Sequence, residues 1–461
     1  MKKLGIHVFR RDLRLEDNTA LNALVKEVDT VLPVFIFDDR QVREHEYQSG
    51  PGLQILCESL QDLHGALKEK GVSLHIRRGI AEECIADLIK ELSPASISFN
   101  LDYTPFSVSR DDAIRAVCEK DGVQVIAEHD VTLHAPGSIV SKDDKPYSVY
   151  THYRIGAEAI PAPMPKRLPA ATTFVEAAGG EDANTAIRRV LPRTRELLVK
   201  GGRTEAKKLL AKLKELKGYA DQRDIPSVKG TSFLSAHIKF GTLSIREIYH
   251  YAKLHMPHPD VYLRELLWHD FFTTVAALTP HVYKGAYRKE FDAIRWNDDE
   301  ETFGRWKEGK TGFPIVDAGM RQLAATGYMH NRVRMITASF LIKDLHLNWQ
   351  WGERYFAQTL SDYDPAVNNG NWQWVAGTGC DASPWFRIFN PWLQQKKFDT
   401  DCAYIKQWLP ELAGLSISDI HEPESEAREA TGYPKPMVEH KKEAEKTKEV
   451  FGRVGKRSSQ M

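Results

Sequence analysis

The chain has 461 residues, of which 42% are hydrophobic, so it is long enough to form two or three domains with a sizeable core. Its 63 basic and 63 acidic residues cancel, which excludes a wholly basic nucleic-acid binder but not a local positive face. No apolar run approaches the roughly 18 residues of a membrane span. The five cysteines contain no C-x-x-C, so we expect neither a metal site nor a disulfide framework. We expect a soluble cytoplasmic protein, or a nuclear one if the source is eukaryotic, with reduced thiols.

The first part of the chain alternates strand-like and helix-like patterns. Short β-rich runs stand at residues 4–9, 31–37, 72–76, 95–99 and 123–126, and helical patterns at 53–71 and 80–92. This alternation predicts an α/β domain with a doubly wound parallel sheet over residues 1–130. The sequence HVFRRDLRLEDN stands where a dinucleotide-binding protein would carry G-x-G-x-x-G, so that fingerprint is absent.

The second part of the chain is predicted to be helical. Residues 160–185 are rich in Pro, Ala and Gly, which indicates an interdomain connector, and we place it at residues 131–203. Helical patterns then follow one another, among them a continuous one at residues 332–345, which predicts an all-α domain over residues 204–451. The end of the chain, residues 452–461, is expected to be a frayed tail.

Two helical patterns carry polar groups beside apolar ones. Glu265 and Trp268 lie three residues apart and so share a helix face. A tryptophan there is usually a core residue, but a buried carboxylate needs a partner. Asn331 and Met335 share another face, while Arg332 points elsewhere. An ordinary helix start with solvated arginines explains them, and so does a face that touches a ligand while the arginines touch phosphates.

Two further segments have an ordinary and a functional interpretation. The hydroxyls of Thr231, Ser232 and Ser235 suit a helix cap, but they also suit a bound pyrophosphate. In SDYDPAVNNGNWQWVAGTG, an Asx-rich turn explains part of the polar content. Asp362, together with Asp364 and Asn368 further along, could instead hydrogen-bond the edge of a planar ring.

Taken as a set, the motifs resemble the photolyase/cryptochrome family, and most of all class I cyclobutane pyrimidine dimer photolyases. The motifs that carry the resemblance are FRRDLRLEDNTAL, GTSFLS, RELLWHDFF, GKTGFPIVDAGMRQL, MHNRVRM, WGERYF, NNGNWQW and FRIFNP. They span nearly the whole chain and are highly specific as a set.

The resemblance implies one FAD per chain, bound in the helical domain. The residues that would bind it are Tyr219, Thr231, Ser232, Phe233, Leu234, Ser235, Arg334, Asp362, Asp364 and Asn368. The hydroxyl segment would hold the phosphates, and Arg334 would pair with Asp362. Asn368 would face flavin N5, where an amide serves both neutral and reduced states without adding charge.

The resemblance also implies an electron relay and a substrate pocket. Trp372, Trp349 and Trp296 would relay electrons from the surface to photoexcited flavin. A flipped-out pyrimidine dimer would be held by Glu265, Trp268, Asn331, Met335 and Trp374. The DNA backbone near the lesion would be contacted by Arg223, Arg332, Arg387 and Gln394.

The implied function is light-dependent repair of cyclobutane pyrimidine dimers by electron transfer from reduced FAD. Two alternatives are a cryptochrome-like blue-light receptor and a photolyase for (6-4) photoproducts. Relatives of the latter kind carry histidines at the positions of Asn331 and Met335, so the residues here favour the cyclobutane dimer. The implied partner is UV-damaged DNA, with no membrane and no obligate protein partner, and we expect a monomer.

A second, light-harvesting chromophore is implied in the N-terminal domain. Phe106 and Ser107 stand where folate-carrying members have an Asn-Glu pair, which disfavours folate. Asp102 stands where deazaflavin-carrying members hold their antenna, so a deazaflavin or a second flavin is favoured.

Overall fold

The chain folds into two compact units. The computed structural model describes the backbone of residues 2–458 and the side chains of residues 2–454. The first unit comprises Met1–Lys217, Ser232–Pro280 and Ser361–Ala366. The second comprises Gly218–Thr231, His281–Leu360 and Val367–Met461. The domain boundaries expected from the sequence stay predictions. Helix α22 continues past residue 451 to Ser458, and residues 459–461 of the expected tail lie outside the described residues.

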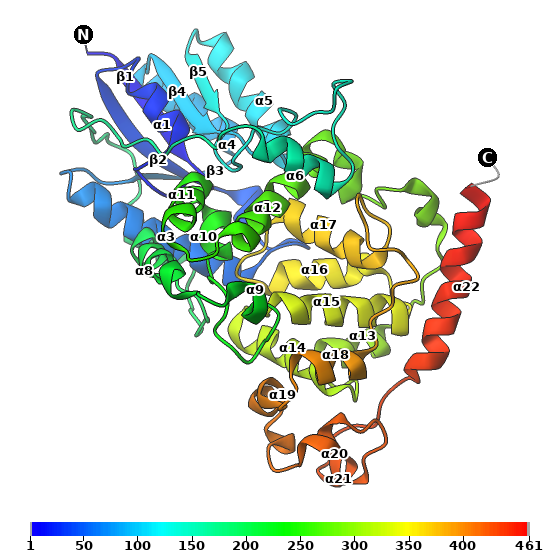
Figure 1. The fold of residues 1–461 in the computed structure, drawn as a ribbon. Coiled ribbons are helices and arrows are strands. Elements are labelled where there is room, and N and C mark those ends of the chain that lie inside the picture. Colours follow the sequence, from blue (N-terminus) through cyan, green and yellow to red (C-terminus); the bar gives the residue numbers. More distant parts are fainter. Residues whose placement is uncertain (1, 459–461) are drawn as a thin grey trace. The chain divides into compact units, whose positions relative to one another are not determined.

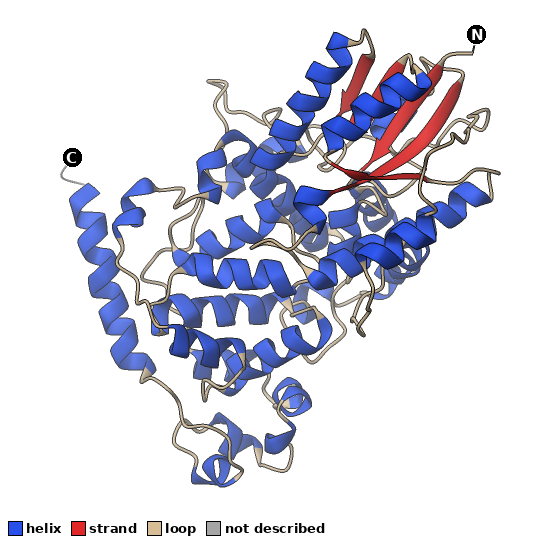
Figure 2. Ribbon diagram, turned by 180° about the vertical axis from the view of Figure 1, so that it is seen from behind, coloured by secondary structure: helices blue, strands red, loops and turns tan. Residues whose placement is uncertain are grey.

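A parallel sheet forms the centre of the first unit (Figures 1 and 2). Its strands are β1 (Leu4–Phe9), β2 (Thr30–Asp38), β3 (His75–Gly79), β4 (Ser96–Asn100) and β5 (Gln124–Glu128). Their order across the sheet is β3-β2-β1-β4-β5, and every pairing is parallel. The predicted doubly wound sheet is confirmed, with the strand order reversing at β1.

The three central strands β1, β2 and β4 are buried on both faces, which explains their continuous apolar runs. In β2, the side chains of Leu32, Val34 and Ile36 pack on one face, against Ile85 and Leu88 of α4 and Ile114 of α5. The alternate side chains of the strand, Val31, Phe35 and Phe37, pack on the other face against Leu60 and Leu63 of α3. Successive side chains of a strand point to opposite faces, so one apolar run contributes to two separate hydrophobic cores.

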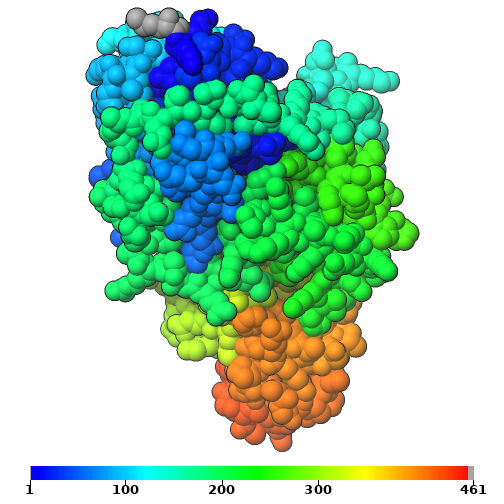
Figure 3. Space-filling model, turned by 90° about the vertical axis from the view of Figure 1, so that its left-hand side faces the viewer, coloured from blue at the N-terminus to red at the C-terminus, as the bar shows by residue number. Residues whose placement is uncertain are grey.

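The other elements of the first unit cover this sheet or follow it in the chain. Its helices are α1 (Thr19–Leu24), α2 (Asp39–Val42), α3 (Gly50–Lys68), α4 (Ala81–Leu92), α5 (Pro105–Lys120), α6 (Tyr150–Glu158), α7 (Ala183–Val190), α8 (Arg203–Ala211), the 3₁₀ turn η1 (Lys212–Glu215), α10 (Ser235–Phe240), α11 (Ile245–His255) and α12 (Asp260–Leu278). In the space-filling view, green residues from later in the chain lie next to the blue residues of α3 (Figure 3), and α3 contacts both α7 and α8.

The second unit is helical, as the sequence predicts. Its elements are α9 (Tyr219–Gln222), the short turns η2 (Pro280–Tyr283), η3 (Lys289–Ala293) and η5 (Pro410–Leu412), α13 (Glu300–Lys307), α14 (Pro314–Thr326), α15 (Asn331–Ser339), the π-helical turn η4 (Phe340–Asp344), α16 (Trp349–Thr359), α17 (Pro365–Ala376, which begins in the first unit), α18 (Pro391–Phe398), α19 (Ala403–Trp408), α20 (Ile417–His421), α21 (Glu426–Ala430) and α22 (His440–Ser458). Within the described residues, none of these helices is both long and apolar enough to cross a membrane.

Two elements differ from the sequence prediction. The third strand is predicted at residues 72–76 but begins at His75, because Val72 and Leu74 enter the core before the hydrogen-bonded ladder starts. The continuous helix predicted at 332–345 changes to a π-helical turn at Phe340, where the amide of Leu345 donates to a carbonyl five residues back.

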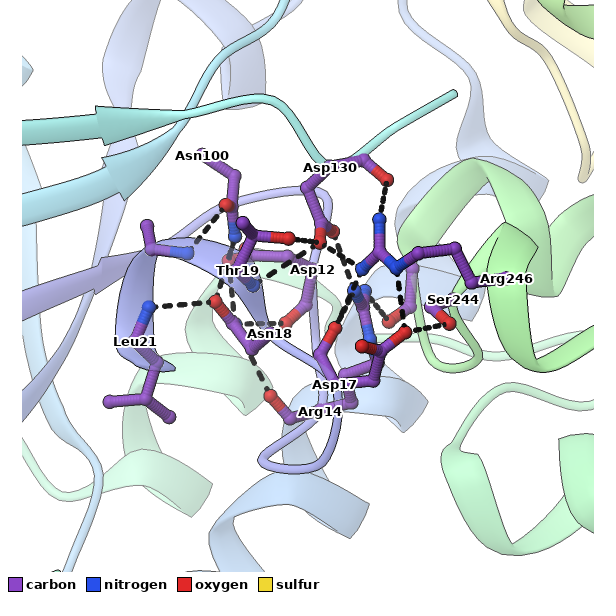
Figure 4. A network of polar contacts seen from close by, with 12 residues as sticks. Asp12, Arg14, Asp17, Asn18, Thr19, Leu21, Asn100, Asp130, Ser244 and Arg246 are labelled. Atoms are coloured by element: carbon purple, nitrogen blue, oxygen red, sulfur yellow. Dashed lines mark hydrogen bonds and ion pairs between the residues drawn. The ribbon is translucent and has the colours of Figure 1, made fainter. Parts of the chain in front are cut away.

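A buried polar network fixes the loop after β1 (Figure 4). Asp130 accepts hydrogen bonds from Arg14 and Arg246 at 2.6 and 2.7 Å, and Arg246 also donates to Asp17 at 2.8 Å. All four side chains are almost completely buried. Burial would raise the pKa of Asp130, but the two arginines outweigh it and lower the pKa. The network therefore joins the loop to the end of β5 and to α11.

The buried His237 of α10 makes the stability of the first unit depend on pH. Its Nδ1 lies 2.9 Å from the Thr242 hydroxyl, and its Nε2 has no hydrogen-bond partner among the described residues. Burial lowers the pKa of His237 to about 4. Because the folded pKa lies below the unfolded one, this stabilising contribution is present above about pH 6.5 and is lost as the pH falls towards 4.

We expect the loss to reach about 3 kcal/mol of unfolding free energy, at about 1.4 kcal/mol per pKa unit. Denaturant unfolding at pH 7 and pH 4.5 measures it, with His237→Gln as the variant that cannot take up the proton. The decrease between the two pH values should be smaller in His237→Gln than in the wild type. The exposed His258 provides the control, and His258→Gln should follow the wild type. Equal decreases in all three proteins would contradict the assignment.

Candidate functional site

The hydroxyl segment of the first unit leads into α10 through a strained residue. Phe233 has φ of 55°, a conformation that bulky residues rarely adopt, and it turns the chain between Ser232 and Leu234. The Ser232 hydroxyl accepts a hydrogen bond from the amide of Leu234 at 3.4 Å. At the start of α10, the hydroxyl of Ser235 donates to Asp362 at 2.6 Å. Two segments far apart in the sequence, both predicted to bind FAD, are therefore brought together.

Arg11 links Asp364 with the candidate antenna residue Asp102. Its guanidinium donates to Asp102 at 2.9 Å and also to Asp364. Burial alone would lower the pKa of Arg11, but the two carboxylates outweigh it and raise the pKa. Asp364 also accepts from the amide of Ala366 at 3.0 Å, at the start of α17. The sequence indicated neither the role of Arg11 nor this pairing of Asp102, although Arg11 lies in the FRRDLRL motif directly after β1.

The side chain of Trp268 on α12 is stacked by an aromatic residue that the sequence analysis missed. The rings of Tyr150 and Trp268 have centroids 3.6 Å apart and planes within 10° of each other. The Tyr150 hydroxyl donates to the carbonyl of Arg264 at 2.7 Å, which fixes its ring. Burial raises the pKa of Tyr150, and the negative charge of Glu265 raises it further. Tyr150 therefore holds one face of Trp268, close to the predicted lesion-binding Glu265.

The second unit places Tyr219, Arg223 and Thr231 in or near α9. Tyr219 is buried, and the guanidinium of Arg223 lies 5.9 Å from the centre of its ring. The hydroxyl oxygen of Thr231 is buried and has no hydrogen-bond partner among the described residues. A buried polar atom of this kind is costly unless something bonds to it. A phosphate oxygen at this position would satisfy it, so the observation fits a bound FAD.

Asn368 on α17 is oriented by Glu353 of α16. Its amide nitrogen donates to the main-chain carbonyl of Glu353 at 3.0 Å and to a carboxylate oxygen of the same residue at 2.9 Å. Both amide hydrogens are used in this way, so the oxygen Oδ1 is the atom left to accept a hydrogen bond from a ligand. A flavin N5–H is such a donor, and the geometry therefore fits the predicted role. Glu353 gave no signal in the sequence beyond its place in WGERYF.

The predicted relay tryptophans all lie in the second unit. Trp372 is 2% exposed and contacts the rings of Phe356 at 5.0 Å and Trp306 at 6.4 Å between centroids. Trp349 is also buried, and the half-buried Trp296 packs against Phe451 with centroids 6.1 Å apart. The relay order from Trp372 through Trp349 to Trp296 stays a prediction. Trp306 was missed by the sequence analysis.

Two of the predicted substrate residues lie on α15, and a third lies on α17. Asn331 at its start is exposed, while Met335 and Trp374 of α17 are half-buried. Arg334 donates to the carbonyl of Met329 at 2.7 Å, and its predicted pairing with Asp362 stays a prediction.

Three of the four predicted DNA contacts line one cavity of about 350 Å³ in the second unit. They are Arg332, Arg387 and Gln394. The sequence analysis did not find Asp224 and Lys397, which line the same cavity. Arg223 is not among the lining residues. A cavity with three cationic side chains suits a phosphate group.

Within the described residues, no three side chains of His, Cys, Asp or Glu cluster as metal ligands would. None of the five cysteines forms a disulfide within the described residues, and four of them are buried.

Known proteins match the chain along most of its length. The family model for the FAD binding domain of DNA photolyase matches residues 262–453, and that for DNA photolyase matches residues 6–171. A deoxyribodipyrimidine photo-lyase of Agrobacterium fabrum is 38% identical, with 97% of each chain covered. The enzyme of the same name from Escherichia coli is 36% identical and covers 94% of this chain and 95% of its own.

Solved structures agree with these matches. An archaeal photolyase from Sulfolobus tokodaii, described with two FAD molecules, is 39% identical and superposes with a TM-score of 0.88 over 98% of this chain and 100% of its own. A class III photolyase from Agrobacterium tumefaciens is 36% identical, with a TM-score of 0.91 over 99% and 98%. The chain belongs to the photolyase/cryptochrome family. Its C-terminal part is an FAD-binding domain. The class I assignment is not confirmed, because a class III photolyase is among these relatives.

The unpartnered hydroxyl of Thr231 gives a direct test of the FAD site. We expect Thr231→Val to weaken FAD binding about 10-fold or more, since a hydrogen bond to a charged group contributes about 1.5–3 kcal/mol. The stability of the apoprotein should stay equal or rise, because the variant removes an unsatisfied buried group. Titration of FAD into apoprotein and denaturant unfolding measure the two quantities.

Thr231→Ser keeps the hydroxyl and serves as the control, with FAD affinity close to that of the wild type. Unchanged FAD affinity in Thr231→Val would remove Thr231 from the site.

Proposed function

We propose that the chain repairs cyclobutane pyrimidine dimers in DNA under light. The observation that carries this proposal is the match to enzymes named deoxyribodipyrimidine photo-lyase, which extends over 94–97% of the chain. Two features of the structure support it. Trp268 is held in a stack beside Glu265, and three cationic side chains line one cavity in the second unit.

The residues of the chain bind and orient the substrate. Trp268 and Trp374 would contact the faces of the extruded dimer, which costs less to flip than a normal base pair because its bases pair poorly. Glu265 would hydrogen-bond the carbonyl edge of the pyrimidines, and Asn331 and Met335 would complete the pocket. Bound FAD would supply electron-transfer chemistry under light, in which the electron given to the dimer is returned, so that its two carbon–carbon bonds would break with no net oxidation or reduction.

The remaining residues would act on the cofactor or the DNA backbone. Asn368 would accept from flavin N5–H through the oxygen that Glu353 leaves available. Arg332, Arg387 and Gln394 would bind phosphates and carry no base information. The expected monomer, the absence of an obligate protein partner and the cytoplasmic location stay predictions.

Illumination of the reduced protein with dimer-containing DNA should restore the absorbance of the separated pyrimidines. Trp268→Ala should lower both dimer binding and repair, because the stacking contact is lost. Absence of restoration by the wild-type protein would contradict the proposal. Repair of (6-4) photoproducts instead of cyclobutane dimers would identify the alternative substrate.

We also propose a second chromophore with a phosphate group at the carboxyl end of the sheet. Asp111 there accepts hydrogen bonds from both Arg10 and Arg110, so two buried cations share one carboxylate. The Nη2 atom of Arg10 lacks a hydrogen-bond partner among the described residues, whereas that of Arg110 lies 3.0 Å from the same Asp111 oxygen. Burial, together with the charge of Arg110, lowers the pKa of Arg10 to about 9. An anionic group, such as the phosphate of a flavin nucleotide, would balance the positive charge of the two arginines.

Support for this second site also comes from the Sulfolobus tokodaii relative with two FAD molecules. The predicted antenna residue Asp102 pairs with Arg11, so the cation pair of Arg10 and Arg110 is the better-supported anchor. A deazaflavin remains the other outcome of extraction.

Arg10→Leu should lower the occupancy of the second chromophore while leaving FAD bound. The variant should fold, because Asp111 keeps Arg110 as its single partner. Extraction of both chromophores and their absorption spectra measure the occupancy. The exposed Arg115 also lies near the ring of Phe99, at 5.8 Å, so Arg115→Leu is the control and should retain both chromophores. A full second chromophore in Arg10→Leu would contradict the assignment.

A further inference from the structure

The cavity of the second unit contains an acid bound to a predicted phosphate-binding arginine. Its lining residues are Asp221, Asp224, Ile225, Arg332, Arg387, Phe389, Gln394, Lys397 and Phe398. Carboxylates repel phosphate, so two aspartates in such a cavity need an explanation.

Arg332 is held from two sides. Its Nε and one terminal nitrogen donate to a single oxygen of Asp224, at 3.2 and 3.0 Å. Its guanidinium carbon lies 4.4 Å from the centre of the Phe398 ring, and the ammonium of Lys397 lies 5.1 Å from the same ring. The backbone amide of Arg332 donates to the ring of His330 at 3.3 Å, at the start of α15. The acid therefore occupies one edge of the guanidinium and the aromatic ring covers a face.

This arrangement restricts how Arg332 can meet a phosphate. The edge that carries Nε is taken by Asp224, so a phosphate can approach only the remaining N–H groups of the terminal nitrogens, in one orientation. A guanidinium without this hold could rotate to reach phosphates in many positions. DNA with an extruded base has a locally displaced backbone, whereas undamaged DNA presents only its regular phosphate spacing. A fixed arginine can distinguish the two, and a mobile one cannot.

We propose that Asp224 is a specificity-determining residue. It fixes Arg332 for the backbone of lesion-containing DNA and weakens the binding of this arginine to the phosphates of undamaged DNA. Phe398 supports the same orientation from the face of the guanidinium. This inference rests on the proposed function in DNA repair, and it adds a repulsive element to a site otherwise composed of attractive contacts.

The test compares binding of undamaged duplex and dimer-containing duplex in the dark. Asp224→Asn should raise the affinity for undamaged duplex about five-fold and change that for dimer duplex less than two-fold, so the ratio of the two falls. The salt dependence for undamaged duplex should steepen by up to about 0.9 in the slope of log K against log salt, the contribution of one more neutralised phosphate.

Asp221→Asn is the matched control. It removes the same charge from the same cavity, but Asp221 is not among the hydrogen-bond partners that the described residues give Arg332. Both affinities should then rise together and their ratio should stay constant. Asp224→Glu keeps the acid and should restore most of the wild-type ratio. An unchanged ratio in Asp224→Asn, or an equal fall in Asp221→Asn, would overturn the proposal.

A second variant guards against a general folding defect. Phe398→Leu keeps every charge of the cavity and removes the ring that faces Arg332, so it should lower the same ratio without a comparable rise in the salt slope. The wild type in the same experiment separates the two hypotheses. If it does not prefer dimer duplex, the proposed function fails. If the wild type prefers dimer duplex and neither Asp224→Asn nor Phe398→Leu changes the ratio of affinities, only the proposed role of Asp224 fails.

Discussion

A cluster of four buried charges determines the geometry of the first unit. Arg14 and Arg246 face Asp17 and Asp130 with almost no exposure to water, and removing one partner from such a group commonly costs about 3–5 kcal/mol. The cluster joins the loop after β1 to the end of β5 and to α11. Because that loop is fixed, the two arginines that precede it in the sequence, Arg10 and Arg11, also have fixed positions at the carboxyl end of the sheet.

The adjacent residues Arg10 and Arg11 lie in different electrostatic environments. Arg11 lies between two carboxylates, Asp102 and Asp364, which outweigh its burial and raise its pKa. Arg10 shares the Asp111 carboxylate with Arg110, and burial together with the charge of Arg110 lowers its pKa against the opposing charges of Asp111 and Asp12. A balanced arginine stabilises the fold, whereas a buried surplus cation is costly unless an anion binds. The number of neighbouring carboxylates therefore indicates a structural role for Arg11 and a ligand-binding role for Arg10. The Arg-Arg dipeptide in the sequence does not distinguish these roles.

Local features of the sequence allowed correct predictions, whereas contacts between distant residues could not be predicted. Strands buried on both faces were predicted because their apolar runs are local, yet the start of β3 was misplaced, since hydrophobicity marks burial and not the first ladder hydrogen bond. Candidate side chains such as Asn368 and Arg332 came from motifs. Their pairing with Glu353 and Asp224 was not predicted, because tertiary folding brings the partners together, over 108 residues in the case of Arg332 and Asp224.

Helix α17 carries residues with different predicted roles on different faces. Asn368 and Trp372 are four residues apart and so lie on one face, whereas Trp374 is two residues further and points away from it. Trp372 is accordingly buried in an aromatic cluster while Trp374 is half-buried. The close packing of Trp372 requires Gly352 on α16, where an added Cβ would lie 2.1 Å from the indole ring. Any side chain at position 352 would therefore push Trp372 away and, with it, disturb the face on which Glu353 orients Asn368.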